Sequence, residues 1–299
     1  MKKADLERVE KFLRPYRVTK GKDFRLKDHD PADTGRLTSE DKDEAKQVLS
    51  DGVEWMAEQQ DMLYAQDHWG LLLVFQAMDA AGKDSAIKHV TSGINPQGCS
   101  VRSFKQPSSE ELDHDFLWRY HEHVPARGQI GIFNRSYYEE VLVVRVHDEL
   151  LRAQKIPPQR IGKKIWDERY QDIRSFESYL DRNGIVVVKF FLNVSKAEQK
   201  RRFIARLDEP EKHWKFAAAD VDERQHWRDY MKAYEGAIRE TATPESPWYV
   251  VPADNKWFSR LVVAGAMVDT LANLGLRYPV VDDAKREALG AARRRLEAE

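Results

Sequence analysis

The chain has 299 residues, of which 41% are hydrophobic and 33% are charged, a composition typical of a folded protein with a heavily charged surface. Its 49 basic and 50 acidic side chains nearly cancel, so the overall charge does not select a polyanionic partner, and any anion site must come from local clustering. The length predicts one α/β domain with additions rather than two equal domains.

Cysteine content and hydropathy indicate the compartment. Cys99 is the only cysteine, so no intrachain disulfide can form, and a reducing environment is expected. The first residues lack the apolar core of a signal peptide, and no apolar stretch approaches the length of a membrane span. We therefore expect a cytoplasmic protein that binds neither membranes nor nucleic acids.

The N-terminal part of the chain is predicted to differ from the rest. Residues 1–38 lack sustained periodicity and carry mixed charge, which predicts an N-terminal arm lying on the main body. The run Thr38-Ser39-Glu40-Asp41 then resembles a helix start, with capping hydroxyls and acids in the first turn. A long helix reaching to about residue 66 should follow.

The central part alternates between strand and helix patterns. Residues 70–76 are apolar apart from the final Gln76, which predicts a strand covered on both faces, as in a parallel sheet. Further strands are predicted at residues 100–104, 129–134, 185–193 and 248–251. Helical patterns occur at about residues 84–92, 109–123, 136–150, 160–182, 195–207, 219–241, 255–274 and 282–298. This alternation predicts a three-layer α/β/α fold with a parallel sheet, and a final helix that is solvated or part of an interface.

A phosphate-binding turn follows the first buried strand. The run Ala77-Met78-Asp79-Ala80-Ala81-Gly82-Lys83 leads directly into a helix. Backbone N–H groups at a helix start point at an anion, and a lysine adds a mobile positive charge. Compared with the pattern G-x-x-x-x-G-K-[ST], the chain keeps Gly82 and Lys83 but has Ala77 and Asp84 at the outer positions. The alternative is a tight turn whose lysine is merely exposed.

Asp79 is the unusual residue of this turn. A carboxylate inside a phosphate cradle repels its ligand unless it holds Mg²⁺ or receives a proton. Its presence therefore indicates chemistry rather than simple anion binding.

A second group of polar residues follows the predicted strand 129–134. Ligands gather at the carboxyl ends of strands in open parallel sheets, so Arg135 and Glu139 should lie beside Asp79 and Lys83. The planar fork of Arg135 suits phosphate oxygens. The alternative is an ordinary helix-face ion pair between Arg135 and Glu139, which are four residues apart.

A basic cluster follows on the helix predicted from residue 195. It contains Lys200, Arg201, Arg202 and Arg206. Such a run is most often a solvated surface, but P-loop kinases close a basic helical lid over the transferred phosphate. We therefore predict a lid over about residues 195–225.

These motifs together resemble those of the polyphosphate kinase 2 family. The resemblance rests on the runs Met78 to Asp84, Asn95-Pro96-Gln97-Gly98 and Phe133 to Glu139, and the stretch from Trp248 to Trp257 extends it. It covers the chain from about residue 20 to 280. It implies a P-loop kinase fold similar to that of thymidylate kinase, in one domain over residues 1–299. It also implies phosphoryl transfer between inorganic polyphosphate and a nucleotide, with Mg²⁺ or alternatively Mn²⁺.

The resemblance further implies roles for individual residues. Asp79 corresponds to the essential acid and the metal ligand, Lys83 to the phosphate-binding lysine, and Arg135 to the arginine of the second motif. Further phosphate contacts are expected from Ala80, Ala81, Gly82, Asp84, Arg201, Arg202 and Arg206. Apart from the resemblance, we expect the nucleotide base to lie against side chains after the second predicted strand, such as Phe104 or Lys105, and Glu139 to contact the nucleotide as well.

The second motif departs from the commonest family pattern. Many members have Asp where this chain has Asn134, and Asn where it has Glu139. The version found here resembles the subgroup called class III, whose members phosphorylate both nucleoside monophosphates and diphosphates. Loss of the carboxylate at position 134 leaves Asp79 as the clearest Mg²⁺ ligand, with Glu139 as a nearby replacement.

The resulting hypothesis is a polyphosphate-dependent nucleotide kinase that converts AMP and ADP to ADP and ATP. Positioning and charge neutralisation should carry the catalysis, without a covalent protein nucleophile. We also expect a homo-oligomer, either a dimer or a tetramer. The alternatives are an ATP-dependent nucleotide or small-molecule kinase on the same fold, and a non-catalytic polyanion-binding protein.

Overall fold

One six-stranded sheet organises the protein. The computed structural model describes residues 1–216 and 218–299, without the side chains of Lys212 and Lys215. In this described part the strand order is β1-β6-β5-β2-β4-β3, with β1 antiparallel to β6 and the other neighbours parallel. The strands are β1 (Arg17–Val18), β2 (Gly70–Ala77), β3 (Cys99–Ser103), β4 (Ile130–Asn134), β5 (Ile185–Asn193) and β6 (Trp248–Pro252).

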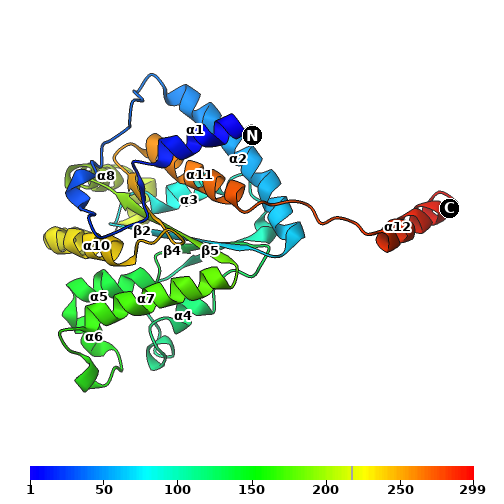
Figure 1. Ribbon diagram of the computed structural model, residues 1–299. Coiled ribbons are helices and arrows are strands. Elements are labelled where there is room, and N and C mark those ends of the chain that lie inside the picture. Colours follow the sequence, from blue (N-terminus) through cyan, green and yellow to red (C-terminus); the bar gives the residue numbers. More distant parts are fainter. Residues whose placement is uncertain (217) are drawn as a thin grey trace.

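Helices cover both faces of this sheet (Figure 1). One face carries α1 (Lys3–Leu13), α2 (Lys42–Gln66), α3 (Lys83–Val90) and α11 (Lys256–Asn273). The other carries α4 (Trp118–His121), α5 (Val143–Val146), α6 (Asp148–Ala153), α7 (Ile165–Arg182) and α10 (Trp227–Thr241). The predicted three-layer α/β/α architecture is therefore confirmed. Among the described helices, none is long and apolar enough to cross a membrane.

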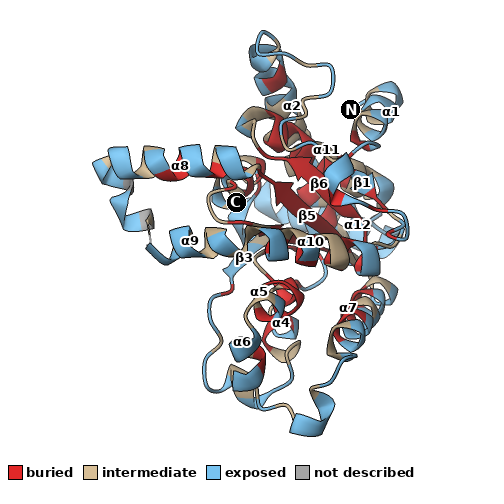
Figure 2. Ribbon diagram, turned by 90° about the vertical axis from the view of Figure 1, so that its left-hand side faces the viewer, coloured by how far each residue is buried: buried red, intermediate tan, exposed pale blue. Residues whose placement is uncertain are grey.

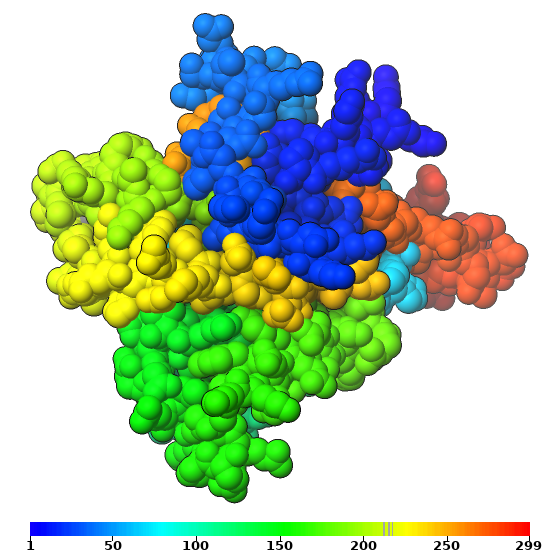
Figure 3. Space-filling model, turned by 60° about the vertical axis from the view of Figure 1, so that its left-hand side comes forward, coloured from blue at the N-terminus to red at the C-terminus, as the bar shows by residue number. Residues whose placement is uncertain are grey.

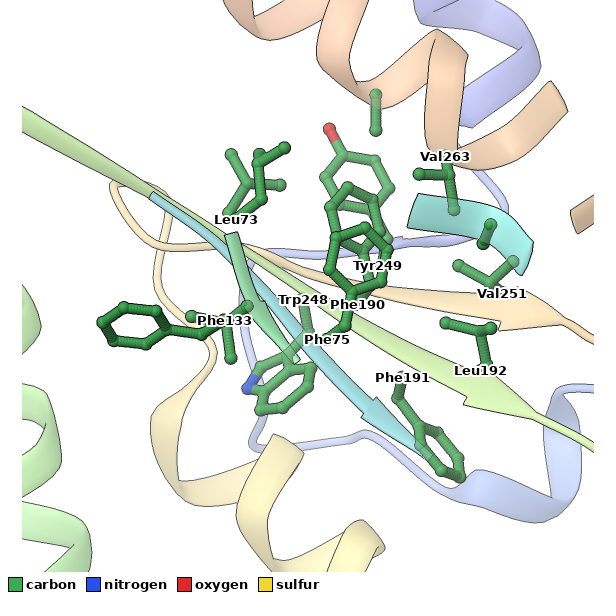
Figure 4. Packing of buried hydrophobic residues seen from close by; sticks show 14 of the residues in the cluster. Leu73, Phe75, Phe133, Phe190, Phe191, Leu192, Trp248, Tyr249, Val251 and Val263 are labelled. Atoms are coloured by element: carbon green, nitrogen blue, oxygen red, sulfur yellow. The ribbon is translucent and has the colours of Figure 1, made fainter. Parts of the chain in front are cut away.

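Aromatic and branched side chains of the central strands form the core. Figure 4 shows Phe75, Phe190 and Tyr249 from three adjacent strands lying next to one another. The ring centroids of Phe75 and Phe190 are 4.8 Å apart, and those of Phe190 and Tyr249 are 5.6 Å apart, both stacked. Burial on both faces of β2, β5 and β6 explains their nearly continuous apolar sequences.

The region predicted as a lid stands apart from this core. It consists of α8 (Lys196–Asp208), the 3₁₀ helix η6 (Pro210–Lys215), α9 (Ala218–Asp222) and the 3₁₀ helix η7 (Glu223–His226). Figure 2 shows α8 and α9 projecting from the body with largely exposed surfaces. Residue 217, inside the predicted lid, lies outside the described residues.

The last helix, α12 (Asp283–Leu296), also stands apart. It follows an extended segment that leaves the body after α11 (Figure 1), and none of its residues is buried. This agrees with the predicted solvated or interface helix.

The N-terminal residues contain more structure than their sequence pattern predicted. They form α1, β1 and the 3₁₀ helix η1 (Leu26–Asp28), and β1 adds to the sheet edge at β6. In Figure 3 this blue segment lies across the surface against the yellow α10, where the Leu26 amide donates to Glu235 Oε2 at 2.8 Å. The first 38 residues are thus packed on the body, as predicted, but are not irregular.

All five predicted strands agree with the structure to within one residue at each end. Among the predicted helices, the one at 219–241 is divided into α9, η7 and α10, and the one at 160–182 begins only at Ile165. The patterns at 109–123 and 136–150 differ more. The pattern at 109–123 yields only the 3₁₀ helix η3 (Glu111–Asp113) and α4. His114 is extended between them, and the Asp115 side chain accepts from the Leu117 amide at 2.9 Å. Such local side-chain bonds compete with a continuous helix.

The pattern at 136–150 is also divided. It forms the 3₁₀ helix η4 (Tyr137–Val141), α5 and α6, because the backbone leaves helical geometry at Leu142 and His147.

A buried polar network fastens η4 to the surrounding elements. Glu177 on α7 accepts from the hydroxyls of Tyr137 at 2.9 Å and Tyr138 at 2.8 Å. Its other oxygen accepts from Lys189 Nζ on β5 at 2.5 Å, and the same ammonium donates to the Thr241 carbonyl at 2.8 Å. Lys189 is fully buried. An unpaired ammonium there would strongly destabilise the fold, and its bonds to Glu177 and Thr241 offset this cost. The network holds the segment that begins directly after Arg135.

Removing one partner of this ion pair should destabilise the fold. We expect Lys189→Met to lower the free energy of unfolding by about 3–5 kcal/mol, because the Glu177 carboxylate stays buried without its cation. The double variant Lys189→Met/Glu177→Gln should recover part of this loss. Urea unfolding followed by circular dichroism measures both.

The matched control is Lys46→Met, which breaks the exposed Lys46–Asp43 pair of α2 and should leave the urea midpoint unchanged. A Lys189→Met protein as stable as the wild type would show that the buried pair contributes nothing to stability.

Candidate active site

The turn between β2 and α3 has an unusual backbone. Ala80 has φ 61° and Gly82 has φ 108°, both in the left-handed region that most side chains avoid. A Cβ on Gly82 would lie 3.7 Å from Arg202 Nη1, so conformation rather than space requires glycine there. This turn places the start of α3 at the carboxyl edge of the sheet. The first amides of the helix, which have no partner within it, are therefore located at that edge.

Lys83, the first residue of α3, lies under this turn. Its Nζ donates to the Ala77 carbonyl at 3.1 Å. Desolvation and the nearby Arg135 guanidinium lower the pKa of the Lys83 ammonium. Three carboxylates act in the opposite direction, those of Asp79, Glu139 and Asp84. A bound polyanion would also oppose the lowering and favour the charged lysine.

Arg135 reaches the turn from the end of β4, as the sequence predicted. Its amide donates to the Phe75 carbonyl at 3.0 Å, its φ is 65°, and its Nη2 lies 3.1 Å from Asp79 Oδ1. Nη1 lies 3.9 Å from Glu139 Oε2. The Glu139 carboxylate is the largest cause of the raised pKa of Arg135. The i,i+4 pair therefore exists, but it is part of a larger cluster that includes the turn.

Two further contacts lock the cluster. Asn134 Nδ2 donates to Asp84 Oδ1 at 2.8 Å and thus joins β4 to α3. Gln76 Nε2 donates to Glu139 Oε1 at 2.8 Å and fixes the orientation of that carboxylate. Gln76 was not predicted as a site residue, although a polar side chain at the end of an otherwise apolar strand is a visible signal.

The carboxylates of Asp79 and Glu139 suit a metal ion that binds together with the phosphates of the substrate. In the described part of the chain, no three His, Cys, Asp or Glu side chains converge as a metal site. Mg²⁺ keeps several waters and is held by one or two carboxylates together with substrate phosphates. The side chain of Asp79, 29% exposed, can supply such a carboxylate, with Glu139 close by.

The three lid arginines predicted to bind phosphate differ in their surroundings. Arg201 is 70% exposed and forms a bidentate pair with Glu198, with both contacts at 2.6 Å. The guanidinium of Arg206 lies 5.6 Å from the centre of the Phe203 ring. Arg202, in contrast, is buried, and its Nη1 and Nη2 donate to backbone carbonyls. Of the three, Arg201 is exposed, Arg206 is partly buried and Arg202 is buried.

The burial of Phe104 does not support its predicted contact with the nucleotide base. Phe104 is 4% exposed, and its ring packs 4.5 Å from that of Tyr120 and 4.9 Å from that of Phe133. It belongs to the core and does not offer a face to a base. Lys105 is exposed, and its carbonyl accepts from Arg119 Nη2 at 3.0 Å.

Most of this chain is similar in sequence to known proteins. A model of the polyphosphate kinase 2 (PPK2) family matches residues 38–276. Over 284 residues, which are 93% of this chain and 98% of the relative, the sequence is 50% identical to an ADP-polyphosphate phosphotransferase of Rhodopseudomonas palustris. It is 42% identical over 275 residues to an AMP/ADP-polyphosphate phosphotransferase of Meiothermus ruber, covering 92% of this chain and 98% of that one.

A solved structure extends the agreement to the fold. The crystal structure of polyphosphate kinase 2 from Arthrobacter aurescens TC1 matches with a TM-score of 0.83 at 41% identity, covering 92% of this chain and 95% of that chain. The P-loop kinase fold expected from the sequence is thereby confirmed. The chain belongs to the polyphosphate kinase 2 family.

Proposed function

We propose that this protein transfers phosphoryl groups between inorganic polyphosphate and nucleoside mono- and diphosphates, converting AMP to ADP and ADP to ATP. The observation that carries the proposal is the cluster of Lys83, Arg135 and Asp79 at the carboxyl edge of the sheet, where Arg135 and Asp79 are 3.1 Å apart. Two cations beside helix-start amides form a site for consecutive phosphate groups. The carboxylate between them suits a phosphate-bound metal.

The residues of the cluster have separable tasks. Lys83 and Arg135 neutralise charge on the transferred group, and the turn amides orient it for in-line attack. Lid arginines such as Arg201 and Arg206 bind polyphosphate and exclude water when the lid closes. The reaction breaks one phosphoanhydride bond and forms another, so it needs no protein nucleophile. The rate acceleration comes from positioning the two substrates.

Asp79, with Glu139 in support, would hold a Mg²⁺ ion, or Mn²⁺ in its place. When bound, the ion would offset negative charge shared by the donor and acceptor phosphates. Arg135 contacts both the Asp79 and the Glu139 carboxylates. It can therefore hold these two metal-binding side chains in place before the substrate binds.

The acceptor range follows from the second motif. The combination of Asn134 and Glu139 resembles the subgroup that uses both AMP and ADP, and one relative carries both acceptors in its name while another carries ADP alone. The proposal includes both acceptors. It also places the protein in the cytoplasm as a homo-oligomer, a dimer or a tetramer.

The direct experiment omits ATP. With long-chain polyphosphate and Mg²⁺, we expect ADP from AMP and ATP from ADP, each followed by chromatography in separate reactions. Product from neither acceptor would overturn the proposal and leave an ATP-dependent kinase or a non-catalytic polyanion binder. Product from ADP alone would restrict the acceptor to diphosphates.

Lys83→Met tests the phosphate turn. Loss of the ammonium should lower kcat by about 10²–10³-fold, because charge stabilisation by a preorganised donor accounts for that much in comparable sites. The control is Lys88→Met, an exposed lysine further along the same helix, which should retain the wild-type kcat. Equal effects of the two substitutions would contradict a specific role for Lys83.

Asp79→Asn tests the metal site. The substitution keeps the shape of the side chain but removes its charge, so the Mg²⁺ concentration for half-maximal rate should rise by about tenfold or more. Asp61→Asn, at an exposed position of α2, should not change it. An unchanged Mg²⁺ dependence in Asp79→Asn would rule out this carboxylate as the ligand.

A further inference from the structure

Arg202 has its complete set of donors engaged within the protein. A guanidinium has five N–H groups, and five oxygens lie within bonding distance of this one. Nε donates to Glu198 Oε1 at 2.7 Å, Nη1 to the carbonyls of Ala80 at 3.0 Å and Ala81 at 2.7 Å, and Nη2 to the carbonyls of Ala253 at 2.6 Å and Asp254 at 3.1 Å. The side chain is 6% exposed. A phosphate oxygen could bind only by displacing one of these partners.

Gln199, one turn earlier on α8, continues the same pattern. Its Nε2 donates to the Asp79 carbonyl at 2.9 Å, and its Oε1 accepts from Arg224 Nη1. Gln199 is 1% exposed. The buried face of α8 therefore holds three consecutive carbonyls of the phosphate turn, those of residues 79, 80 and 81.

Holding these carbonyls determines where the turn amides point. In a planar trans peptide the C=O of one residue and the N–H of the next point in opposite directions. With the carbonyls of Asp79 and Ala81 bound to α8, the amides of Ala80 and Gly82 are directed away from it. The amide of Ala81 is already used by the Met78 carbonyl at 3.2 Å. Such an array of amides forms an anion-binding concavity.

We propose that Arg202 is a positioning residue that holds the phosphate turn in its binding conformation, and that it is not itself a phosphate ligand. It joins the turn to the loop after β6 and thereby stabilises the left-handed geometry of Ala80 and Gly82. The proposal rests on the phosphoryl-transfer function in one respect only, namely that the turn binds phosphate.

A phosphate ligand and a positioning clamp predict different effects of Arg202→Lys. A phosphate ligand needs positive charge, which Arg202→Lys keeps. A clamp needs two pairs of N–H groups directed at two separate loops, which an ammonium with three donors on a single atom cannot supply. For a clamp, Arg202→Lys should therefore be as damaging as Arg202→Gln.

The first measurement needs no substrate. In hydrogen–deuterium exchange of the free protein, Arg202→Lys should speed exchange about tenfold or more in peptides covering residues 78–84 and 252–256, because both loops lose their partner. The distant surface variant Arg152→Lys should leave these peptides unchanged. Unaltered exchange in Arg202→Lys would overturn the proposal, whether or not the enzyme turns over polyphosphate.

The second measurement uses turnover with polyphosphate and ADP. For Arg202→Lys and Arg202→Gln we expect kcat to fall about hundredfold, as for a misplaced site, with KM for polyphosphate changed less than about threefold. Arg201→Gln should instead mainly raise that KM. A Lys variant that keeps most of kcat while Gln loses it would identify Arg202 as a charge-based phosphate ligand and refute the clamp.

Absence of turnover in the wild type would refute the proposed function but leave the exchange result valid. If the Arg202 variants do not fold, Gln199→Leu removes the contact to the Asp79 carbonyl, together with the bond that Gln199 accepts from Arg224, and leaves Arg202 in place. It should speed exchange in residues 78–84 without affecting 252–256. No change there would refute the clamp in the same way.

Discussion

The parallel pairing of β2 with β4 on one side and β5 on the other is the constraint on which the site depends. Phe75 of β2 lies opposite Asn134 of β4, and Ala77 lies opposite Leu192 of β5. All three strands therefore end at one edge of the sheet, and the segments that follow them meet there. The phosphate turn, the arginine motif and the lid helix come from distant parts of the sequence, yet this register alone brings them within hydrogen-bonding distance.

The balance of charge at this edge explains how Lys83 and Arg135 can lie together in the free protein. Lys83 and Arg135 would repel each other in a half-buried site, and desolvation adds to the cost. Carboxylates among them, with Asp79 and Glu139 directly contacting Arg135, compensate the cations. A polyanion can then take over that compensation as it binds. Asp79 thus compensates positive charge in the free protein, in addition to its proposed role as a metal ligand.

Buried strands and the phosphate turn could be predicted from the sequence because their signals are local and strong. Continuous apolar runs identify strands covered on both faces, and Gly82-Lys83 after such a run indicates the turn. The fate of single side chains could not be predicted. Phe104 and Arg202 have the residue types of ligand-binding groups, but burial assigns the first to the core and five internal acceptors engage the second. Gln76 and Gln199 gain their roles only from partners far along the chain.

Helix α8 has two faces with different surroundings. Arg201 is exposed to solvent, whereas Gln199 and Arg202 donate hydrogen bonds to carbonyls of the phosphate turn. A rigid helix carries any displacement of one face to the other. Polyphosphate bound to Arg201, as proposed, would therefore act on the carbonyls that orient the turn amides. The Glu198 carboxylate, which bonds both Arg201 and Arg202, joins the two faces directly. In the proposed function, this shared partner would couple the capture of polyphosphate at Arg201 to the geometry of the phosphate turn.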